Sequence, residues 1–443
     1  MLNVLDFTDS SFDAATLREK MPRAKVDVEK ALEAVRPLIE AVRAEGAKAL
    51  RDQAEKFDQV RPKYLRVPQA EIDKALRELD PALREAIETS IVHNRLGHEM
   101  QLPNAATREI IPGGTVAQRW IPVTRVGLYV PGGLAVYPSS VIMNVIPAQV
   151  AGVKEIALAS PAQEAFGGLP HPTVLATCAL LGVSEVYAMG GAGAIGAFAY
   201  GARGETFEDG DVLLDPVDVV TGPGNIYVAA AKRLVSGVCG IDAEAGTTEI
   251  AIIADASAKP AFVAADLISQ AEHDPAAASV LITDSRDLVA AVQDELECQV
   301  PLRDHHERIH TALTGQQSGA ILTRDVAQSI EVANAYAAEH LEIQTEDAAA
   351  VAGRIHNAGA IFVGDYTPVP LGDYLAGSNH VLPTGGTARY HSGLNVHAFL
   401  KSVQEIHYTR EAADALTDRL VTFARAEDLE GHGASLLARR EGN

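Results

Sequence analysis

Cysteine, clustered basic residues and long apolar runs are all scarce in this sequence of 443 residues. The three cysteines are odd in number and far apart, which fits a reducing compartment. Lys and Arg number 37 against 59 Asp and Glu, giving a net charge of −22 with no dense basic block. Nucleic acids and anionic membrane surfaces are therefore not expected partners.

Apolar stretches long enough to cross a bilayer are also missing. The longest hydrophobic region, residues 141–153, is interrupted by Asn144, Pro147 and Gln149. The first residues, MLNVLDFTDSSFD, are acidic where a secretory signal would be basic. Together with the cysteine pattern, these features predict a cytoplasmic protein without a membrane span.

The apolar content is high enough for a large folded core. Hydrophobic residues make up 47% of the chain and charged residues 22%, which argues against extensive disorder. A chain of this length has room for two or three ordinary domains or one large α/β assembly.

The first hundred residues have helical periodicity. From Asp27 to about Met100, apolar residues recur at spacings of three and four, which predicts an amphipathic helical layer. Within it, Asp80 is placed as an N-cap and Pro81 at the first helical position. Residues 108–123, which alternate around Pro112, Gly113 and Gly114, predict a β-hairpin.

After residue 125, short β-branched runs alternate with helical segments. This alternation predicts parallel sheets, because parallel neighbours need a crossover of helix length. Two series are joined near residues 245–248, and the early helices are expected to cover one of them. The final stretch, from His391, is polar and helical with too few apolar residues for a core of its own. The expected strands are VGLYV, EIALA, VYAM, DVV, EIAIIAD, SVLITD, GAILT, LEIQT and AIFVGD.

Three glycine-rich turns each follow an expected strand and precede an expected helix. They are PGG at 131–133, GGAGAIG at 190–196 and TGPGN at 221–225. The carboxyl ends of parallel strands, beside helix N-termini, are where open α/β sheets bind ligands. The middle turn has dinucleotide spacing through Gly191, Gly193 and Gly196, but no acidic partner lies at a clear strand end 20 residues on. Glycines are also what tight strand-to-helix connections require.

Histidines concentrate in the second half, where eleven of the 14 lie from His273 onward. Gln270 and His273 are three residues apart near a helix end, so both side chains could ligate one metal. Alternatively, His273 only interacts with the carbonyl end of its helix.

Three further sites combine acidic, imidazole and small residues. Glu339 and His340 are adjacent, just before the LEIQT strand, and could provide two proton acceptors of different basicity. The alternative is that they are an ordinary pair of solvated side chains. Asp373 and His380 flank a Gly- and Ser-rich loop whose composition indicates function. His432 lies among small residues and is a further candidate site residue. The alternative is that it is a surface histidine in a frayed C-terminal tail. Cys298 has no His or Asn nearby, so no thiol mechanism is indicated.

Several rare strings together resemble the histidinol dehydrogenase family. They are RVGLYVPGG, TGPGNIYVAAAKR, ISQAEHDP, AEHLEI, GDYLAGSNHVLPT and the late EGH, collinear from Arg18 to His432. The resemblance implies a homodimer with shared active sites that oxidises L-histidinol to L-histidine. It also implies two successive NAD⁺-dependent steps through L-histidinal and one Zn²⁺ per subunit.

The resemblance also implies the site residues. The zinc ligands would be Gln270, His273, Asp373 and His432, and the catalytic pair would be Glu339 and His340. The histidinol site would be lined by Thr248, Gln270, His273, Glu339, His340, Asp373, His380, Glu427 and His432. NAD⁺ would contact Tyr129 and Asn225, whereas Gly193 stands where many members have a cofactor-contacting glutamine.

The fold implied is α/β, with two incomplete Rossmann-like domains, an N-terminal helical layer and a C-terminal helical tail. The expected division is an N-terminal extension at 1–25, a zinc and catalytic domain from 26–128 and 250–390, an NAD domain at 129–249, and a tail at 391–443 that packs on the partner subunit. In the implied chemistry, zinc would hold the substrate's nitrogens, His340 would take the hydroxyl proton and Glu339 would activate a water. Two rivals remain, a zinc hydrolase without NAD dependence and a metal-stabilised scaffold.

Overall fold

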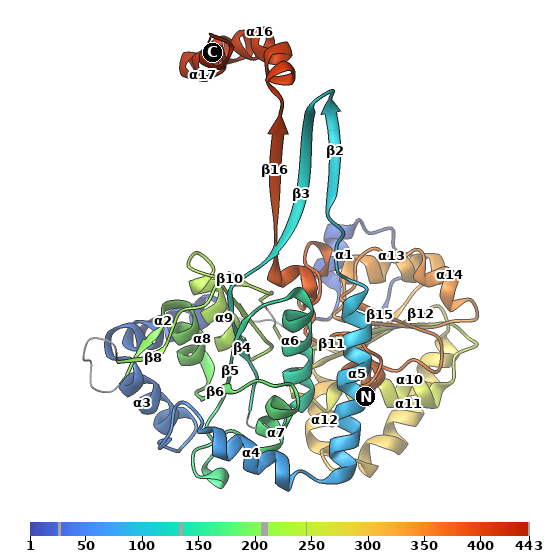
Figure 1. Cartoon of the computed structure of the whole chain (residues 1–443). Coiled ribbons are helices and arrows are strands. Elements are labelled where there is room, and N and C mark those ends of the chain that lie inside the picture. The colour runs from blue at the N-terminus through green and yellow to red at the C-terminus, as the bar shows by residue number, and fades with distance from the viewer. Residues whose placement is uncertain (25–27, 133–135, 205–210, 245, 442–443) are drawn as a thin grey trace. The chain divides into compact units, whose positions relative to one another are not determined.

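The computed structural model describes residues 1–24, 28–132, 136–204, 211–244 and 246–441. The chain divides into two compact units, residues 1–101 with 124–398 and residues 102–123 with 399–443. Figure 1 labels the helices and strands of both. Within the described ranges, no helix is long and apolar enough to cross a membrane.

The first unit contains a six-stranded parallel sheet in the order β1-β13-β12-β11-β14-β15. Figure 1 labels β11, β12 and β15 of this sheet. Its strands are β1 (Val4–Asp6), β11 (Glu249–Ala254), β12 (Ala278–Thr283), β13 (Gly319–Leu322), β14 (His340–Gln344) and β15 (Ala360–Val363). Along β11, Ile250 and Ile252 enter one core, and Ala251 and Ile253 enter the other. Both faces are therefore covered, as is typical of parallel sheets.

Helices cover the two faces of this sheet. On one side lie α10 (Pro260–Ala271), α11 (Arg286–Gln299) and α12 (His306–Thr314), and on the other α1 (Ala14–Lys20), α13 (Val326–Tyr336) and α14 (Ala348–Ala352). The short α15 spans Val369–Tyr374. The segment expected to be an N-terminal extension supplies a strand of this sheet, because β1 pairs with β13 and forms one edge of it.

A five-stranded parallel sheet, in the order β10-β9-β4-β5-β6, completes the α/β part of the unit. Its strands are β4 (Arg125–Tyr129), β5 (Glu155–Ser160), β6 (Glu185–Ala188), β9 (Val219–Thr221) and β10 (Gly240–Ile241). Its crossover helices are α6 (Pro138–Ala151), α7 (Pro172–Leu180), α8 (Gly191–Tyr200) and α9 (Ile226–Val235). The α/β class expected from the alternating pattern is confirmed.

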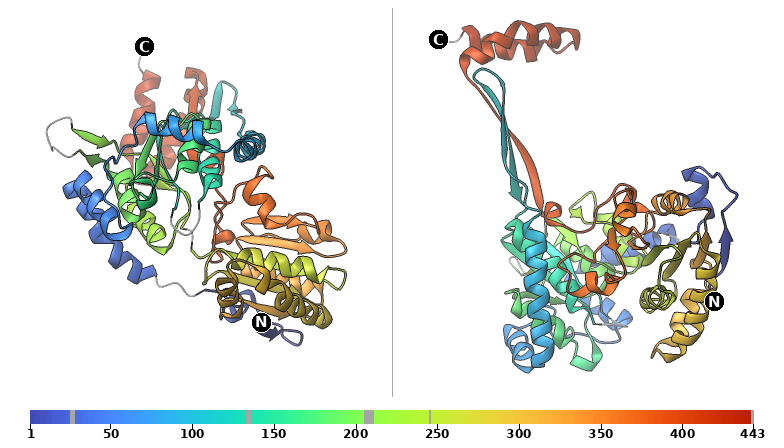
Figure 2. Two further views of the ribbon diagram at one scale, coloured as in Figure 1. Left: turned by 90° about the horizontal axis from the view of Figure 1, so that it is seen from below. Right: turned by 90° about the vertical axis from the view of Figure 1, so that its right-hand side faces the viewer.

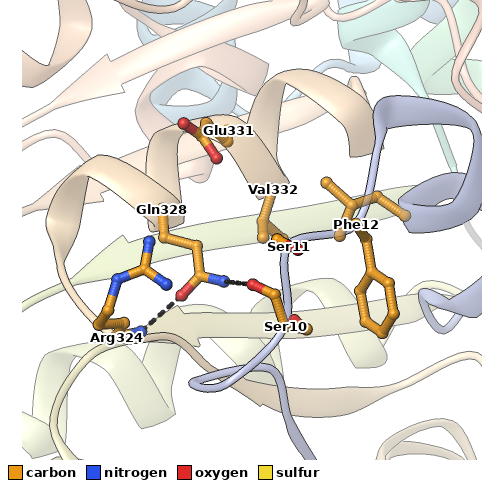
Figure 3. Close-up of a pocket in the computed structure, with 8 residues that line it drawn as sticks. Ser10, Ser11, Phe12, Arg324, Gln328, Glu331 and Val332 are labelled. Carbon is orange, nitrogen blue, oxygen red and sulfur yellow. Dashed lines mark hydrogen bonds between the residues drawn. The ribbon is translucent and has the colours of Figure 1, made fainter.

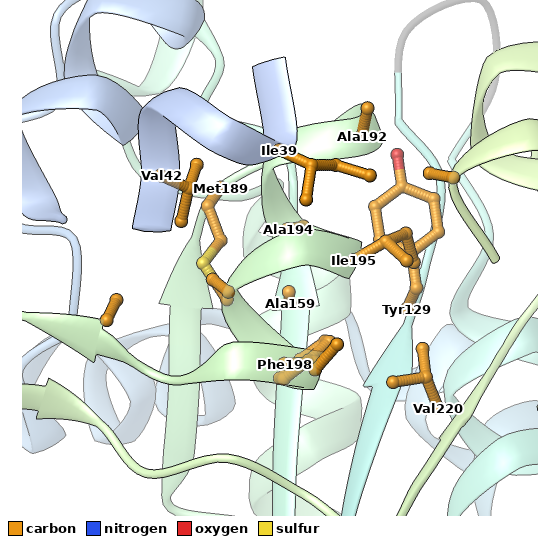
Figure 4. Packing of buried hydrophobic residues seen from close by; sticks show 14 of the residues in the cluster. Ile39, Val42, Tyr129, Ala159, Met189, Ala192, Ala194, Ile195, Phe198 and Val220 are labelled. Carbon is orange, nitrogen blue, oxygen red and sulfur yellow. The ribbon is translucent and has the colours of Figure 1, made fainter. Parts of the chain in front are cut away.

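The helix α2 (Val28–Glu45) packs against α8 and α9, the crossover helices of the five-stranded sheet. Its apolar stripe, which includes Ile39 and Val42, joins the core around Phe198 (Figure 4). Close approach depends on glycine, since a Cβ at Gly196 would lie 3.3 Å from Ile39. Residues 26–128 were expected to form one domain with residues 250–390, but α2 packs with the elements of residues 129–249 instead. Helical periodicity reveals that a helix has an apolar face, but it does not reveal which surface that face covers.

The remaining elements of the first unit are short or peripheral. They are α3 (Ala47–Phe57), α4 (Gln69–Glu78), α5 (Pro81–Glu99), the antiparallel pair β7 (Ala202–Arg203) and β8 (Val212–Leu214), and 3-10 helices at Glu164–Phe166, Val300–Leu302 and Thr387–Arg389. The Asp80 side chain accepts hydrogen bonds from the backbone N–H groups of Ala82 and Leu83, which confirms the expected N-cap of α5.

The second unit is built on a three-stranded antiparallel sheet in the order β16-β3-β2. It comprises β2 (Ala106–Ile111), β3 (Gly114–Pro122), β16 (Leu400–Tyr408), α16 (Arg410–Ala426) and α17 (Glu430–Glu441). The helices α16 and α17 pack together at one end of this sheet (Figure 2). The expected hairpin is confirmed, but the tail includes a strand where only helix was expected. The polar alternation of residues 400–408 fits a strand that is largely exposed on both faces.

Candidate active site

The paired residues Glu339 and His340 lie where helix α13 gives way to strand β14. The helix ends with Ala337 in the left-handed conformation (φ 53°), and His340 is the first residue of the strand. Both side chains are buried, with 7% of Glu339 and 4% of His340 exposed. The alternative of a solvated Glu–His pair is thus wrong.

A chain of hydrogen bonds connects this pair to the neighbouring strand and helix. The Gln270 amide donates from Nε2 to Thr248 Oγ1 (2.6 Å), and that hydroxyl donates to Glu339 Oε2 (2.5 Å). The backbone N–H of Glu249 donates to the same carboxylate oxygen (2.9 Å). Strands β11 and β14 are paired with Ile250 opposite His340, so the preceding residues Glu249 and Glu339 lie side by side at the amino edge of the sheet.

The tautomer of His340 follows from its partner. Its Nδ1 lies 3.3 Å from the carbonyl oxygen of Glu249, which can only accept a hydrogen bond, so Nδ1 carries the proton. Its Nε2 is then an unprotonated acceptor, and this atom is buried without a hydrogen-bond partner.

Burial changes the proton affinities of the cluster. It raises the pKa of Glu339 to about 7, against the opposing hydrogen bonds from Thr248 and Glu249. It lowers the pKa of His340, which the neighbouring Asp373 carboxylate partly offsets. Burial also raises the pKa of Asp373 to about 6. The pair therefore holds a weakly acidic carboxyl beside a neutral imidazole near pH 7.

The other sequence-predicted residues of the first unit lie around this pair. Asp373 is on α15, and His273 follows the last turn of α10 and retains solvent exposure. The imidazole of His380 is within 3.0 Å of Ser140 Oγ, at the start of α6. Burial lowers the pKa of His380 to about 4, and His340 and His273 act on it in the same direction. The fold thus brings together seven of the sequence-predicted site residues, namely Thr248, Gln270, His273, Glu339, His340, Asp373 and His380.

One unpartnered atom tests whether the cluster suits a metal. Gln270 Oε1 is buried without a hydrogen-bond partner. An amide oxygen, together with the imidazole of His273 and the carboxylate of Asp373, is a ligand type that zinc accepts. Among the residues that the structure describes, however, His, Cys, Asp and Glu side chains form no group of three placed to hold a metal ion. The donor chemistry fits zinc, but the set within this chain is incomplete.

The expected cofactor residues lie at the carboxyl edge of the five-stranded sheet. Tyr129 ends β4, and its buried hydroxyl accepts a hydrogen bond from the N–H of Gly191 (3.1 Å). Asn225 follows β9 and caps α9, with its side-chain oxygen accepting from Tyr227 N and Val228 N. Of the PGG turn, Gly133 lies outside the described residues.

Gly193 has a structural explanation inside α8. A Cβ at this position would lie 2.5 Å from Gln53 Oε1, and Gln53 itself donates to the carbonyl oxygen of Leu38 (3.0 Å). The glycine therefore makes room for a side chain of α3. Gly196 does the same for α2, so helix packing accounts for two of the three glycines of the dinucleotide-like spacing.

Glu427 and His432 are in the second unit, and both side chains are exposed. Glu427 ends α16, and His432 is in the first turn of α17.

Sequence reasoning missed two neighbours of the cluster. Glu249 is 2% exposed and forms an ion pair with Arg23 (3.1 Å), which also stacks on the ring of Tyr336. Ser140, the partner of His380, is also buried. A buried charge within the apolar strand EIAIIAD was the available signal for Glu249.

A small pocket elsewhere in the first unit contains none of these residues. It measures about 180 Å³ and is lined by side chains that include Ser10, Phe12 and Arg324. Figure 3 shows Gln328 spanning it, donating to the Ser10 carbonyl oxygen and accepting from Arg324 N. Gln328 also donates to Phe7 O, so the polar groups here fasten the N-terminal segment to α13.

Comparisons with known proteins show that this α/β chain is an NAD-dependent oxidoreductase of the dehydrogenase class. The family model "Histidinol dehydrogenase" matches residues 21–440. The histidinol dehydrogenase of Nocardia farcinica is 57% identical over 437 residues, covering 99% of this chain and 97% of that protein. The chain belongs to the histidinol dehydrogenase family.

Two further relatives agree. The histidinol dehydrogenase of Bifidobacterium longum is 56% identical over 440 residues, covering 99% of this chain and 93% of that protein. A crystal structure of histidinol dehydrogenase from Elizabethkingia anophelis superposes with a TM-score of 0.90 at 31% identity, covering 99% of this chain and 98% of that chain.

Proposed function

We propose that this protein oxidises L-histidinol to L-histidine through L-histidinal, using two NAD⁺ and one Zn²⁺ per subunit. The observation that carries the proposal is the buried Glu339–His340 pair, linked through Thr248 to an amide whose oxygen has no partner. NAD⁺ supplies the hydride acceptor. The remaining chemistry is proton transfer and positioning, which these side chains can perform.

His340 is the proposed base of the first oxidation. Its Nδ1 proton is directed to the Glu249 carbonyl oxygen, so Nε2 is left to accept the proton of the substrate hydroxyl. Burial keeps the imidazole neutral at the start of the step by lowering its pKa.

Glu339 is the proposed base of the second oxidation, where it removes a proton from the water that attacks the aldehyde. A pKa of about 7 suits this role, because a general base works best when its pKa lies near the operating pH. The hydroxyl of Thr248 and the N–H of Glu249 hold one carboxylate oxygen and leave the other available.

Zinc would be held by Gln270, His273 and Asp373, with the fourth ligand from His432 of the partner subunit. When bound, zinc supplies a Lewis acid that fixes the nitrogens of histidinol. Thr248, His380 and the partner subunit's Glu427 would complete the substrate site. Tyr129 and Asn225 would contact NAD⁺ at the carboxyl edge of the five-stranded sheet, and we propose no contact for Gly193.

A homodimer with shared sites is supported by the exposed apolar side chains of the second unit. Phe423 is 68% exposed, Ile406 65% and Ile110 55%. Of the regularly spaced apolar positions of α16, Ala412 is buried, while Leu420 is 38% exposed. Side chains of this size need a surface to cover them, and a second copy of this chain would supply it.

The test is the yield of NADH from a limiting amount of L-histidinol. The proposal requires two equivalents of NADH per histidinol and the appearance of L-histidine. One equivalent would end the reaction at the aldehyde, and none would favour a zinc hydrolase. If removal of zinc unfolds the protein instead of abolishing turnover of a folded one, the metal is structural.

A further inference from the structure

One face of helix α5 carries polar residues that neither the fold nor the proposed chemistry has used. Ser90, Asn94 and His98 recur at intervals of four residues, and His93 lies three residues after Ser90, so all four share one face. Ser90 is 6% exposed, Asn94 1% and His98 0%. Buried polar side chains on one helix face require partners.

Those partners belong to the loop between Asp373 and His380. Ser90 Oγ donates to the carbonyl oxygen of Tyr374 (2.5 Å), and Asn94 Nδ2 donates to that of Ser378 (2.7 Å). His93 Nδ1 lies 2.8 Å from the carbonyl oxygen of Leu375, which also makes it a donor. Two successive turns of the helix therefore hold three backbone carbonyls of this segment.

His98 extends the contact to the residue that precedes His380. Its Nδ1 donates to Asn94 O (2.7 Å), which leaves Nε2 to accept from Asn379 Nδ2 (3.3 Å). The same amide donates to the carbonyl oxygen of Met143 on α6 (2.6 Å). Asn379 is thus fixed between two helices, next to the imidazole that contacts Ser140.

A pair of glycines lets helix and loop touch at the backbone. A Cβ at Gly97 would lie 1.9 Å from the carbonyl oxygen of Gly377. Gly377 has φ +84°, and its own Cβ would lie 2.6 Å from His93 O. The backbones of α5 and the loop are so close here that any residue larger than glycine at position 97 would push the helix away from the loop.

We propose that α5 positions Asp373 and His380 by holding residues 374–379, and that Ser90, Asn94 and His98 are positioning residues of the active site. The inference rests on the proposed function, in which Asp373 binds zinc and His380 lines the histidinol site. Residues that orient metal ligands typically change metal affinity or activity by about ten- to hundredfold when they are removed.

Three variants test the proposal by different routes. Ser90→Ala and Asn94→Ala each remove a donor, whereas Gly97→Ala removes no hydrogen bond and forces the helix from the loop. Thr89→Ala is the matched control, because the Thr89 hydroxyl donates only within α5, to Glu85 O (2.8 Å). Ser90→Thr keeps a hydroxyl and should restore the behaviour of the parent protein.

Three measurements are made on the full-length enzyme. Zinc affinity, by competition with a chelator, and the KM for histidinol should each worsen by about ten- to hundredfold, while the KM for NAD⁺ stays within about twofold. In the metal-free protein, amide hydrogen exchange should accelerate in residues 374–379 of the three variants and not of Thr89→Ala. A general loss of stability would raise both KM values and would not be restored by Ser90→Thr.

Two outcomes overturn the inference separately from the function. The first outcome is that the parent enzyme oxidises histidinol, but all three variants have the same zinc affinity and the same KM for histidinol as Thr89→Ala. This result would refute the positioning role and leave the proposed function intact. A parent enzyme without zinc-dependent oxidation of histidinol would refute the proposed function, and this inference with it.

Discussion

A buried ion pair beneath the TGPGN turn offers the sharpest test of how the structure supports its cofactor edge. Lys232 on α9 lies 2.6 Å from Asp242, and the two side chains are only 1% and 2% exposed. Lys232 also donates to the carbonyl oxygen of Gly222 (2.9 Å), and Asp242 accepts from the Gly222 N–H (2.9 Å). The pair thus holds both polar groups of one glycine in the turn that ends at Asn225.

Lys232→Met keeps most of the length of the side chain and removes its charge. The Asp242 carboxylate would then be buried with no cation, which typically costs about 3–5 kcal/mol of stability. Lys232→Met with Asp242→Asn removes both charges and keeps an acceptor for Gly222 N–H, so the double variant should lose about 1–2 kcal/mol. The two substitutions should therefore be strongly non-additive.

The assay is equilibrium urea unfolding of the parent protein, both single variants and the double variant. The KM for NAD⁺ should rise in Lys232→Met while the KM for histidinol changes little, because the loosened turn leads to Asn225. A cost below about 1 kcal/mol for Lys232→Met, or additive effects in the double variant, would show that the buried charges are not coupled as the distances indicate.

The remaining predictions concern the catalytic cluster. The variants His273→Ala and Asp373→Ala should each lose zinc and nearly all turnover. Their circular dichroism spectra should stay unchanged, because both residues lie near helix ends and outside the cores. Full zinc occupancy in a variant would remove that residue from the ligand set. Glu339→Gln should impair oxidation of added L-histidinal far more than the first step. Because Glu339 acts as a base only when it is deprotonated, the rate of histidinal oxidation by the parent enzyme should rise with pH through about 7. The Glu339→Gln variant should lack this rise. An equal loss of rate in both half-reactions would refute the assignment of Glu339 to the second oxidation. Co-expressed His340→Ala and His432→Ala should recover about one quarter of wild-type activity if sites are shared, and mixed dimers without activity would contradict sharing.

Much of the fold could be predicted because its signals are local. The apolar runs EIALA and EIAIIAD correspond to β5 and β11, and Asp80 caps α5 as its position before Pro81 predicted. Adjacency in sequence also kept Glu339 and His340 together, so this pair could be nominated without any knowledge of folding.

The surfaces that the elements cover could not be predicted in this way. The periodicity of α2 shows that Ile39 needs a partner, but the small residues of α8 that receive it lie more than 150 positions away. Likewise, residues 400–408 become a strand only because β3 is available for pairing. Local propensity is a weak signal where a long-range partner decides the conformation.

The sequence by itself determined the alternation of strands and helices in the α/β part, the N-cap of α5 and the chemical types present in each turn, because these depend on side chains within a few positions. Only the tertiary structure decided that the acid–imidazole pair lies at the amino edge of one sheet and Tyr129 at the carboxyl edge of the other. It also decided that α5 contacts the loop before His380. Burial sets the pKa of Glu339, and burial is a sum over residues from distant parts of the chain that only folding brings together.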